Sequence, residues 1–330
     1  MTQCRSGLQP KQRGLALITA VLVVAIVATV AATLALGETV WLRQSQNMAD
    51  RAQAESLRQG ALGYAAILLA RDGNQPNKTD HLKELWAQPL PPLPVEDGMI
   101  AFTVSDAQSR FNLNNLVGTG VPGNDNIAIF QRLLTSQGLD PGLSAALRDW
   151  LDPTSNTRTG GSLDTEYLNL PQPYRAANQA LSSVDELRLV KGFSADVVET
   201  LRPYVIALPM TMPTPINVNT AGEQVLAALF ATPPPPAVLK ALLEKRADTP
   251  FESVAQFNAS LPAGTPVPTA SLIDVKTGYF LVTIDIVYGR LQRRTVALIE
   301  RPLGKPASVV WHQLPPLSPL PLKMSPDEKT

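Results

Sequence analysis

The basic segment Lys11-Gln12-Arg13-Gly14 leads directly into the apolar stretch Leu15 to Leu36. Residues 15–36 carry no charged side chain and are long enough to cross a bilayer as one helix. The residues before them include Arg5, Lys11 and Arg13 but no acid, and a basic flank of this kind stays in the cytoplasm. We therefore expect a single membrane pass with a cytoplasmic N-terminus and the bulk of the chain on the other side.

The position of Gly14 distinguishes this segment from a secretory signal. A signal peptide has an apolar core of about 7–15 residues with its small-residue cleavage site after the core. Here the apolar run is longer and the small residue precedes it, so cleavage at Gly14 would leave the helix on the mature chain. The alternatives are an uncleaved anchor and cleavage near Ala32-Thr33-Leu34-Ala35, which is only a weak site.

The basic leader, Gly14 and the apolar helix resemble the N-terminus of type IV prepilins. That resemblance implies cleavage between Gly14 and Leu15 by prepilin peptidase, followed by methylation of the Leu15 amine.

One position departs from the family pattern. Prepilins usually carry Glu at the fifth mature residue, where it is thought to pair with the amine of a neighbouring subunit, whereas this chain has Thr19. An unpaired carboxylate is costly inside a membrane, but a threonine hydroxyl can bond to its own helix backbone. Thr19 therefore suggests a subunit at the tip of a filament, with an ordinary membrane-compatible residue as the alternative.

Composition narrows the classes of function. The chain has 330 residues, enough for two domains beside an anchor, and equal numbers of basic and acidic residues. Loss of the basic leader would leave it slightly acidic, which argues against nucleic acid as the main partner. The only cysteine, Cys4, lies in the leader, so the mature chain would have no disulfide and no cysteine metal site. His81 and His312 belong to no recognisable motif, and we expect no enzyme.

A long helix is predicted to continue beyond the membrane. Apolar residues recur near helical spacing up to residue 68, no proline occurs from Lys11 to Gln75, and Asp72-Gly73-Asn74-Gln75-Pro76 is a stop signal. We expect this helix to contact partner helices through Trp41, Met48, Ala52 and Leu57.

The remaining pattern predicts an α+β fold, with a long helix packed on an antiparallel sheet and a large all-α domain inserted between strands. Residues 100–104 alternate as a strand, with 110–114 as their expected partner and the asparagines there facing solvent or capping the loop. Residues 280–288 and 292–300 are predicted to form a hairpin, followed by a short strand at 309–312. The expected divisions are a leader at 1–14, a spine helix at 15–72, sheet segments at 73–123 and 273–312, helices at 124–272 and a proline-rich, disordered tail at 313–330.

Several segments resemble, in order, the K-type minor pseudopilin family of bacterial type II secretion. They are Arg110-Phe111-Asn112-Leu113-Asn114-Asn115-Leu116, Asp149-Trp150-Leu151-Asp152, Pro173-Tyr174-Arg175-Ala176-Ala177-Asn178, Glu186-Leu187-Arg188, Ile216-Asn217-Val218-Asn219-Thr220-Ala221 and Val310-Trp311-His312. The resemblance implies an inner-membrane protein with a periplasmic bulk. It also implies a tip complex with the I-type and J-type minor pseudopilins, which initiates the pseudopilus and supports export of folded proteins across the outer membrane. The secretin and the secreted cargo are further candidate partners.

The same resemblance implies a calcium site next to Asp149-Trp150-Leu151-Asp152. Asp152, Asn156 and Asp164 fall at matching positions, but Thr154 and Leu163 stand where the family usually has acids. Calcium needs several oxygen ligands, so these departures weaken the expected site, and the alternative is a polar loop with capping aspartates. We expect no other cofactor.

Two other functions compete with this interpretation. Val184 to Tyr204 and Ile216 to Phe230 resemble helix-hairpin-helix units, so the chain could be a membrane-anchored DNA-binding protein of a competence-type pilus. The hairpin at residues 189–194 lacks the second glycine, however, and the surrounding charge is balanced. An envelope-anchored hydrolase has no nucleophile motif to support it.

Overall fold

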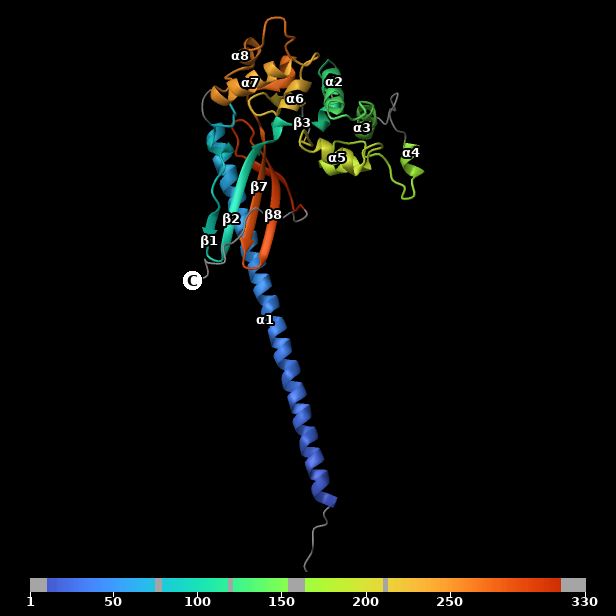
Figure 1. Ribbon diagram of the computed structural model, residues 1–330, viewed down its shortest axis with the longest axis vertical. Coiled ribbons are helices and arrows are strands. Elements are labelled where there is room, and N and C mark those ends of the chain that lie inside the picture. Colours follow the sequence, from blue (N-terminus) through green and yellow to red (C-terminus); the bar gives the residue numbers. More distant parts are fainter. Residues whose placement is uncertain (1–10, 75–78, 118–120, 154–163, 210–212, 316–330) are drawn as a thin grey trace, which may run out of the picture.

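The computed structural model describes residues 11–74, 79–117, 121–153, 164–209 and 213–315. Its most extended element is the helix α1 (Lys11–Gly73), which we call the spine helix. At 1.5 Å per residue, its 63 residues span about 95 Å. The N-terminal half projects alone, and the C-terminal part packs on a sheet (Figure 1).

The sheet has five antiparallel strands in the order β1-β2-β7-β8-β9. These strands are β1 (Leu93–Val95), β2 (Gly98–Asp106), β7 (Tyr279–Tyr288), β8 (Leu291–Glu300) and β9 (Ser308–Gln313). The hairpin of β7 and β8, with its turn at Gly289-Arg290, confirms the sequence prediction to within one residue at each end. A short turn of 3-10 helix, η1 (Leu85–Ala87), joins the spine helix to the sheet.

The first core lies between the spine helix and one face of the sheet. Small side chains on the helix, Ala54, Ala61 and Ala65, allow the strands to approach, and the sheet contributes residues such as Phe102 and Ile284. The edge of this core is closed by an aromatic pair, since Trp86 from η1 stands edge-on to Phe280 with ring centroids 5.1 Å apart. This packing fixes the upper part of the spine helix against the strands.

The predicted pairing of residues 110–114 with 100–104 is wrong. The short strand β3 (Phe111–Asn112) pairs in parallel with β4 (Val205–Ile206), and β2 pairs with β7 instead. The chain turns away from β2 through a 3-10 turn, η2 (Ala107–Ser109), which is stabilised because the Asp106 carboxylate accepts a hydrogen bond of 2.7 Å from the Gln108 amide. The alternation after residue 110 therefore reflects burial in a second core.

The inserted domain comprises residues 107–278, between β2 and β7, and lies at the end of the spine helix remote from its N-terminus (Figure 1). Two short parallel strand pairs, β3 with β4 and β5 with β6, make it mostly rather than entirely helical. Its other elements are η3 (Leu113–Val117), α2 (Val121–Ser136), α3 (Leu143–Leu151), α4 (Asp164–Leu168), η4 (Val184–Leu189), α5 (Ala195–Leu201), β5 (Ile216–Asn217), α6 (Glu223–Ala228), α7 (Pro236–Asp248), α8 (Val254–Ala259), η5 (Ala270–Leu272) and β6 (Ile273–Asp274).

Buried asparagines hold the inserted domain together, and Asn112 and Asn114 are among them, so the expectation that these two face solvent is wrong. Asn114 accepts a hydrogen bond from the Leu181 amide and donates to the carbonyls of Leu181 and Leu208 at 3.0 and 2.8 Å. Asn219 makes the same two-way bond with the Phe251 backbone. Each side-chain amide thus bonds to backbone groups that have no neighbouring strand to pair with. Without it, each buried backbone group left unsatisfied would cost about 1–3 kcal/mol of stability.

Candidate functional site: the spine helix and its junction with the inserted domain

The N-terminal half of the spine helix has the length and apolar composition to cross a membrane, and its side chains from Leu15 onward are exposed. Gly14 lies within this helix. The Thr19 hydroxyl donates a hydrogen bond of 3.0 Å to the Ala16 carbonyl. Thr19 thus satisfies its hydroxyl within its own helix, as the sequence predicted, and needs no partner in an apolar environment.

The four residues expected to contact partner helices do not share one face. Trp41 and Met48 are 69% and 70% exposed and Ala52 is exposed, but Leu57 is half-buried against the core between helix and sheet. Five residues of α-helix turn the side-chain direction by about 140° from Ala52 to Leu57. Leu57 therefore packs within the chain, and the prediction that it contacts a partner helix is wrong.

Beyond Ala52 the exposed side of the helix continues with small residues, which have no hydrophobic periodicity that could have predicted this side. Ser56, Gly60 and Gly63 are exposed, and a Cβ atom at either glycine would meet nothing within 4 Å. Small side chains allow the backbones of two helices to approach closely. The outer side of the spine helix can therefore accept a second helix.

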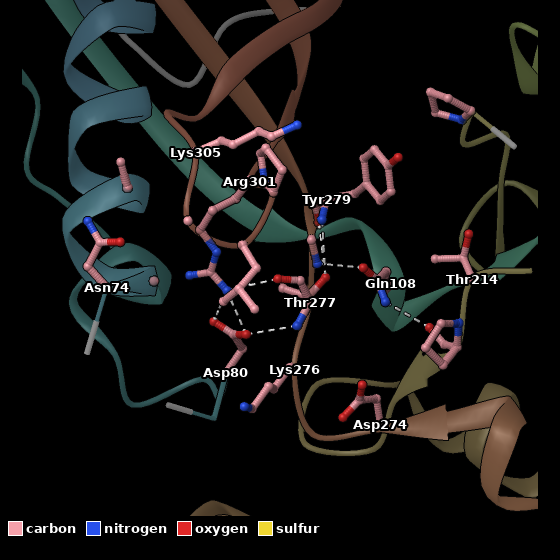
Figure 2. A pocket seen from close by; sticks show the side chains of 18 of the residues that line it. Asn74, Asp80, Gln108, Thr214, Asp274, Lys276, Thr277, Tyr279, Arg301 and Lys305 are labelled. Atoms are coloured by element: carbon pink, nitrogen blue, oxygen red, sulfur yellow. Dashed lines mark hydrogen bonds and ion pairs between the residues drawn. The ribbon is translucent and has the colours of Figure 1, made fainter. Parts of the chain in front are cut away.

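An arginine joins the top of the spine helix to the sheet. Arg301, just after β8, places its Nη1 atom 2.9 Å from Oδ2 of Asp72 and its Nη2 atom 2.6 Å from Oδ1 of Asp80. It also donates to the Thr277 carbonyl at 2.8 Å, and its guanidinium carbon lies 4.6 Å from the centre of the Phe280 ring. Figure 2 shows the contacts of Arg301 with Asp80 and Thr277, which line a cavity of about 550 Å³.

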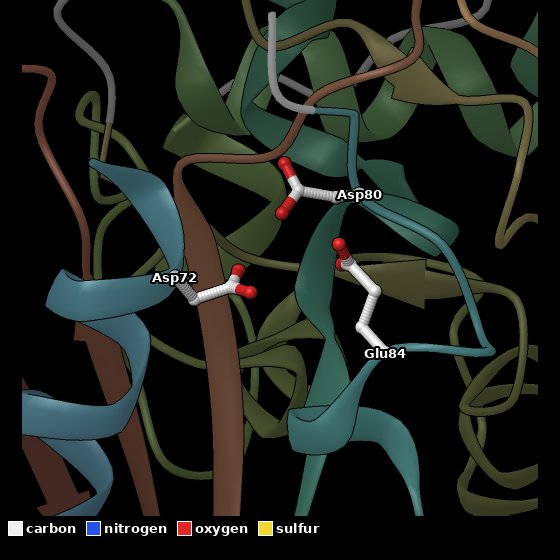
Figure 3. A group of neighbouring side chains, drawn as sticks. All are labelled: Asp72, Asp80 and Glu84. Carbon is white, nitrogen blue, oxygen red and sulfur yellow. The ribbon is translucent and has the colours of Figure 1, made fainter. Parts of the chain in front are cut away.

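Asp72, Asp80 and Glu84 form an acidic group beside this arginine (Figure 3). Each offers one carboxylate oxygen within 4.8 Å of the others, and within the described part of the chain no other three acidic or histidine side chains come this close. Arg301 already lies against two of them, and Glu84 accepts a hydrogen bond of 2.6 Å from the Trp86 indole. The single charge of Arg301 therefore offsets part of the negative charge of this group, and all three carboxylates have protein partners.

A second buried carboxylate joins β2 to the inserted domain. Asp106 accepts hydrogen bonds from the side chains of Asn217 and Thr220 at 2.9 and 2.5 Å. Burial raises the pKa of Asp106 to about 6, because the charged form loses more solvation than these donors return.

The structure describes two of the three predicted calcium ligands. Asp152 is buried at the end of α3, Asp164 begins α4, and Asn156 lies outside the described residues. Asp164 accepts a hydrogen bond of 3.2 Å from the Ala176 amide, and the ring centroids of Trp150 and Tyr174 are 6.2 Å apart. The segments 149–152 and 173–178, which both resemble the family, are therefore neighbours.

The helix-hairpin-helix-like unit has its cations paired. Lys191 lies 2.6 Å from Glu166, and Arg202 lies 2.6 Å from Asp185. Gly192, in the hairpin, has a φ of 86°, and a Cβ there would lie 2.6 Å from the Leu143 side chain. The hairpin therefore packs against α3, and this unit presents a balanced surface to nucleic acid.

Comparison with known proteins agrees with these features. Family models described as type II secretion system (T2SS), protein K match residues 109–210 and 216–276. The chain is 36% identical over 302 residues to type II secretion system protein K of Pseudomonas aeruginosa, covering 88% of this chain and 89% of that protein. The chain belongs to the type II secretion system protein K family. The protein K of Klebsiella pneumoniae is 35% identical over 309 residues, covering 88% of this chain and 93% of the relative.

A solved structure of this family has the same fold. A chain of the GspK-GspI-GspJ complex from the enterotoxigenic Escherichia coli type 2 secretion system matches with a TM-score of 0.74 and 28% sequence identity. The match covers 83% of this chain and all of that chain. The α+β fold predicted from sequence is therefore confirmed, and the protein is a K-type minor pseudopilin.

Proposed function

We propose that this K-type pseudopilin caps the type II secretion pseudopilus as part of a tip complex with the I-type and J-type minor pseudopilins, and that this complex initiates the filament and supports export of folded proteins across the outer membrane. The observation that carries the proposal is the position of the inserted domain at the far end of the spine helix (Figure 1). A body of this size, at the end away from the membrane segment, occupies the space where a further subunit would stack.

Two features of the spine helix support the same position. Thr19 replaces the acid of a lattice subunit and satisfies its hydroxyl internally. The exposed side that carries Trp41, Met48 and Ala52 can accept neighbouring helices. The relative from enterotoxigenic E. coli was solved together with GspI and GspJ, which identifies the class of partner.

The proposed topology places the N-terminus in the cytoplasm and the sheet and inserted domain in the periplasm of a bacterial inner-membrane protein. Prepilin peptidase would remove the leader at Gly14, and Leu15 would become the methylated N-terminus. Secretin and cargo are proposed contacts of the tip. The balanced ion pairs of the helix-hairpin-helix-like unit do not favour the DNA-binding alternative.

We also propose that calcium binds beside α3 through Asp152, Asn156 and Asp164. The buried carboxylates Asp149 and Asp152 suit a hard cation, although Asp164 shares its oxygens with the Ala176 amide and Arg175. A bound ion would tie the end of α3 to the start of α4.

Co-expression of the full chain with I-type and J-type pseudopilins tests the tip proposal. We expect a ternary complex after detergent extraction, with gold-labelled antibody to this chain at filament ends. Labelling along the whole length of overexpressed pseudopili, or the absence of a complex with either partner, would contradict it.

A further inference from the structure

A second cleft lies on the sheet face opposite to the spine helix. Residues of β7 and β8 alternate between the two faces, so Leu281 and Val296 point away from the helix, and they form the floor with Ile206 of β4. The cleft has a volume of about 710 Å³, within the range of clefts that enclose a ligand of several side chains. Trp311 of β9 lines one side, and η4 and α5 of the inserted domain line the other.

Arg110 lines this cleft without a partner among the described residues. It is half-buried, and its guanidinium makes no hydrogen bond or ion pair within that part of the chain, although the other arginines of the cleft do. Burial lowers the pKa of Arg110, because the surroundings solvate its charge less well than water does. A charge withdrawn from water without an acceptor is unfavourable, so the fold alone does not account for an arginine at this position.

The other charged groups that line the cleft balance one another. Arg202 lies 2.6 Å from Asp185 and 2.9 Å from Glu199, and Arg188 lies 2.9 Å from Glu199. Two cations thus face two anions, and Arg110 leaves the described lining of the cleft with one unmatched positive charge.

We propose that this cleft is a docking site for an extended segment of a partner protein that presents a single carboxylate beside an apolar side chain. A carboxylate accepts two parallel hydrogen bonds from a guanidinium, which supplies the partner that Arg110 lacks. The apolar neighbour would lie on Leu281 and Val296 beside Trp311. A phosphate group fits less well, because Asp185 and Glu199 at the rim would repel its additional charge.

We propose that the docked segment belongs to another protein. The C-terminal residues of this chain are the alternative occupant. Gln313, Leu314 and Pro315 line the cleft, and the sequence that follows them, residues 316–330, includes Asp327 and Glu328. The test must separate these two sources.

Random heptapeptides displayed on phage are panned against the full chain in detergent. We expect the bound peptides to be enriched in Asp or Glu next to Leu, Phe or Trp. A labelled synthetic peptide from the enriched set should bind at least tenfold more weakly to Arg110→Met, measured by fluorescence anisotropy. The amide analogue of that peptide should lose binding to the same extent. Arg290→Met, which removes an exposed arginine at the β7–β8 turn, is the matched control and should leave binding unchanged.

Trp311→Ala gives a second variant on the other side of the cleft and should also weaken binding tenfold, with thermal melts showing that each variant folds. Equal binding to the wild type and Arg110→Met, or enriched peptides without acids, would overturn the proposal. Binding that appears only after deletion of residues 316–330 would overturn it as well, because the occupant would then be the chain's own tail.

Discussion

The Nη2 atom of Arg301 lies 2.6 Å from Oδ1 of Asp80, a carboxylate with no exposed surface. The two residues are 221 positions apart in sequence, yet this pair joins the segment after the spine helix to the segment after β8. A buried charge of this kind depends on its partner, because water cannot replace it.

Arg301→Met should therefore destabilise the protein by about 3–5 kcal/mol, since it leaves Asp80 buried without its cation. Thermal unfolding of the full chain in detergent measures the effect. Lys240→Met, which breaks the exposed Lys240–Glu244 pair, should change stability by less than about 1 kcal/mol. Asp80→Asn in the Arg301→Met background should recover part of the loss, and an equally unstable double variant would contradict this account.

Asp106 should make stability fall as the pH rises from about 4 to about 6. Its folded pKa, about 6, lies above its ordinary value of 3.8, so the folded state holds a proton that the unfolded state has released. This contribution is fully present below the ordinary pKa, is lost as the pH passes the folded pKa, and amounts to on the order of 2–3 kcal/mol. Melting temperatures of wild type and Asp106→Asn across this range test it, and parallel curves would contradict it.

Calcium should raise the melting temperature, because a ligand that binds only the folded state stabilises that state. Asp152→Ala and Asp164→Ala should each remove the increase at millimolar calcium, whereas Asp274→Ala, outside this segment, should keep it. A wild-type chain that shows no shift and purifies without metal would mean that Thr154 and Leu163 have cost the site its affinity.

Met48→Asp should weaken assembly with the I-type and J-type partners without unfolding the domain. Met48 is exposed in the single chain, so the new carboxylate would be buried unpaired only in the complex, at a cost of about 3–5 kcal/mol. Asn47→Asp, at a neighbouring exposed position, adds the same charge about 100° around the helix and is the matched control. Leu57→Asp is unsuitable, because Leu57 packs against the sheet. Comparable loss of complex in both position-47 and position-48 variants would argue against the proposed face.

Processing should produce a mature chain that begins at Leu15. Prepilin peptidase is expected to cut after Gly14, and Gly14→Leu should block the cut, while Gly37→Ala, beyond the apolar stretch, should not. Mass spectrometry of the N-terminus decides the question. A chain that retains Met1, or one that begins after Ala35, would exclude the prepilin interpretation.

Local patterns in the sequence predicted the elements that depend on local physics. The stop signal after Asp72 ended the spine helix within a residue or two, and the alternation of residues 280–300 gave the hairpin. Thr19 was interpretable for the same reason, because its hydrogen bond stays within one turn of helix.

Long-range relationships could not be predicted from the sequence. The partner of β2 is β7, which follows the whole inserted domain, and alternation alone does not say which strand pairs with which. The bond between Asp80 and Arg301 joins two common residue types with no local signal. The prediction that Leu57 shares a face with the other partner-facing residues is wrong for a different reason. It rests on approximate spacing, and at 100° per residue Leu57 points to another side of the helix.

The strands β2 and β7 flank the inserted domain in sequence. Asp106, the last residue of β2, pairs in the sheet with Phe280, the second residue of β7. Closing so long a loop has an entropic cost that grows by only about 0.6 kcal/mol for each doubling of length, but it must be met before the strands can pair. Folding of the inserted domain first would bring these two ends together. We therefore expect β2 and β7 to pair late in folding, after the inserted domain has formed, although they are direct neighbours in the sheet.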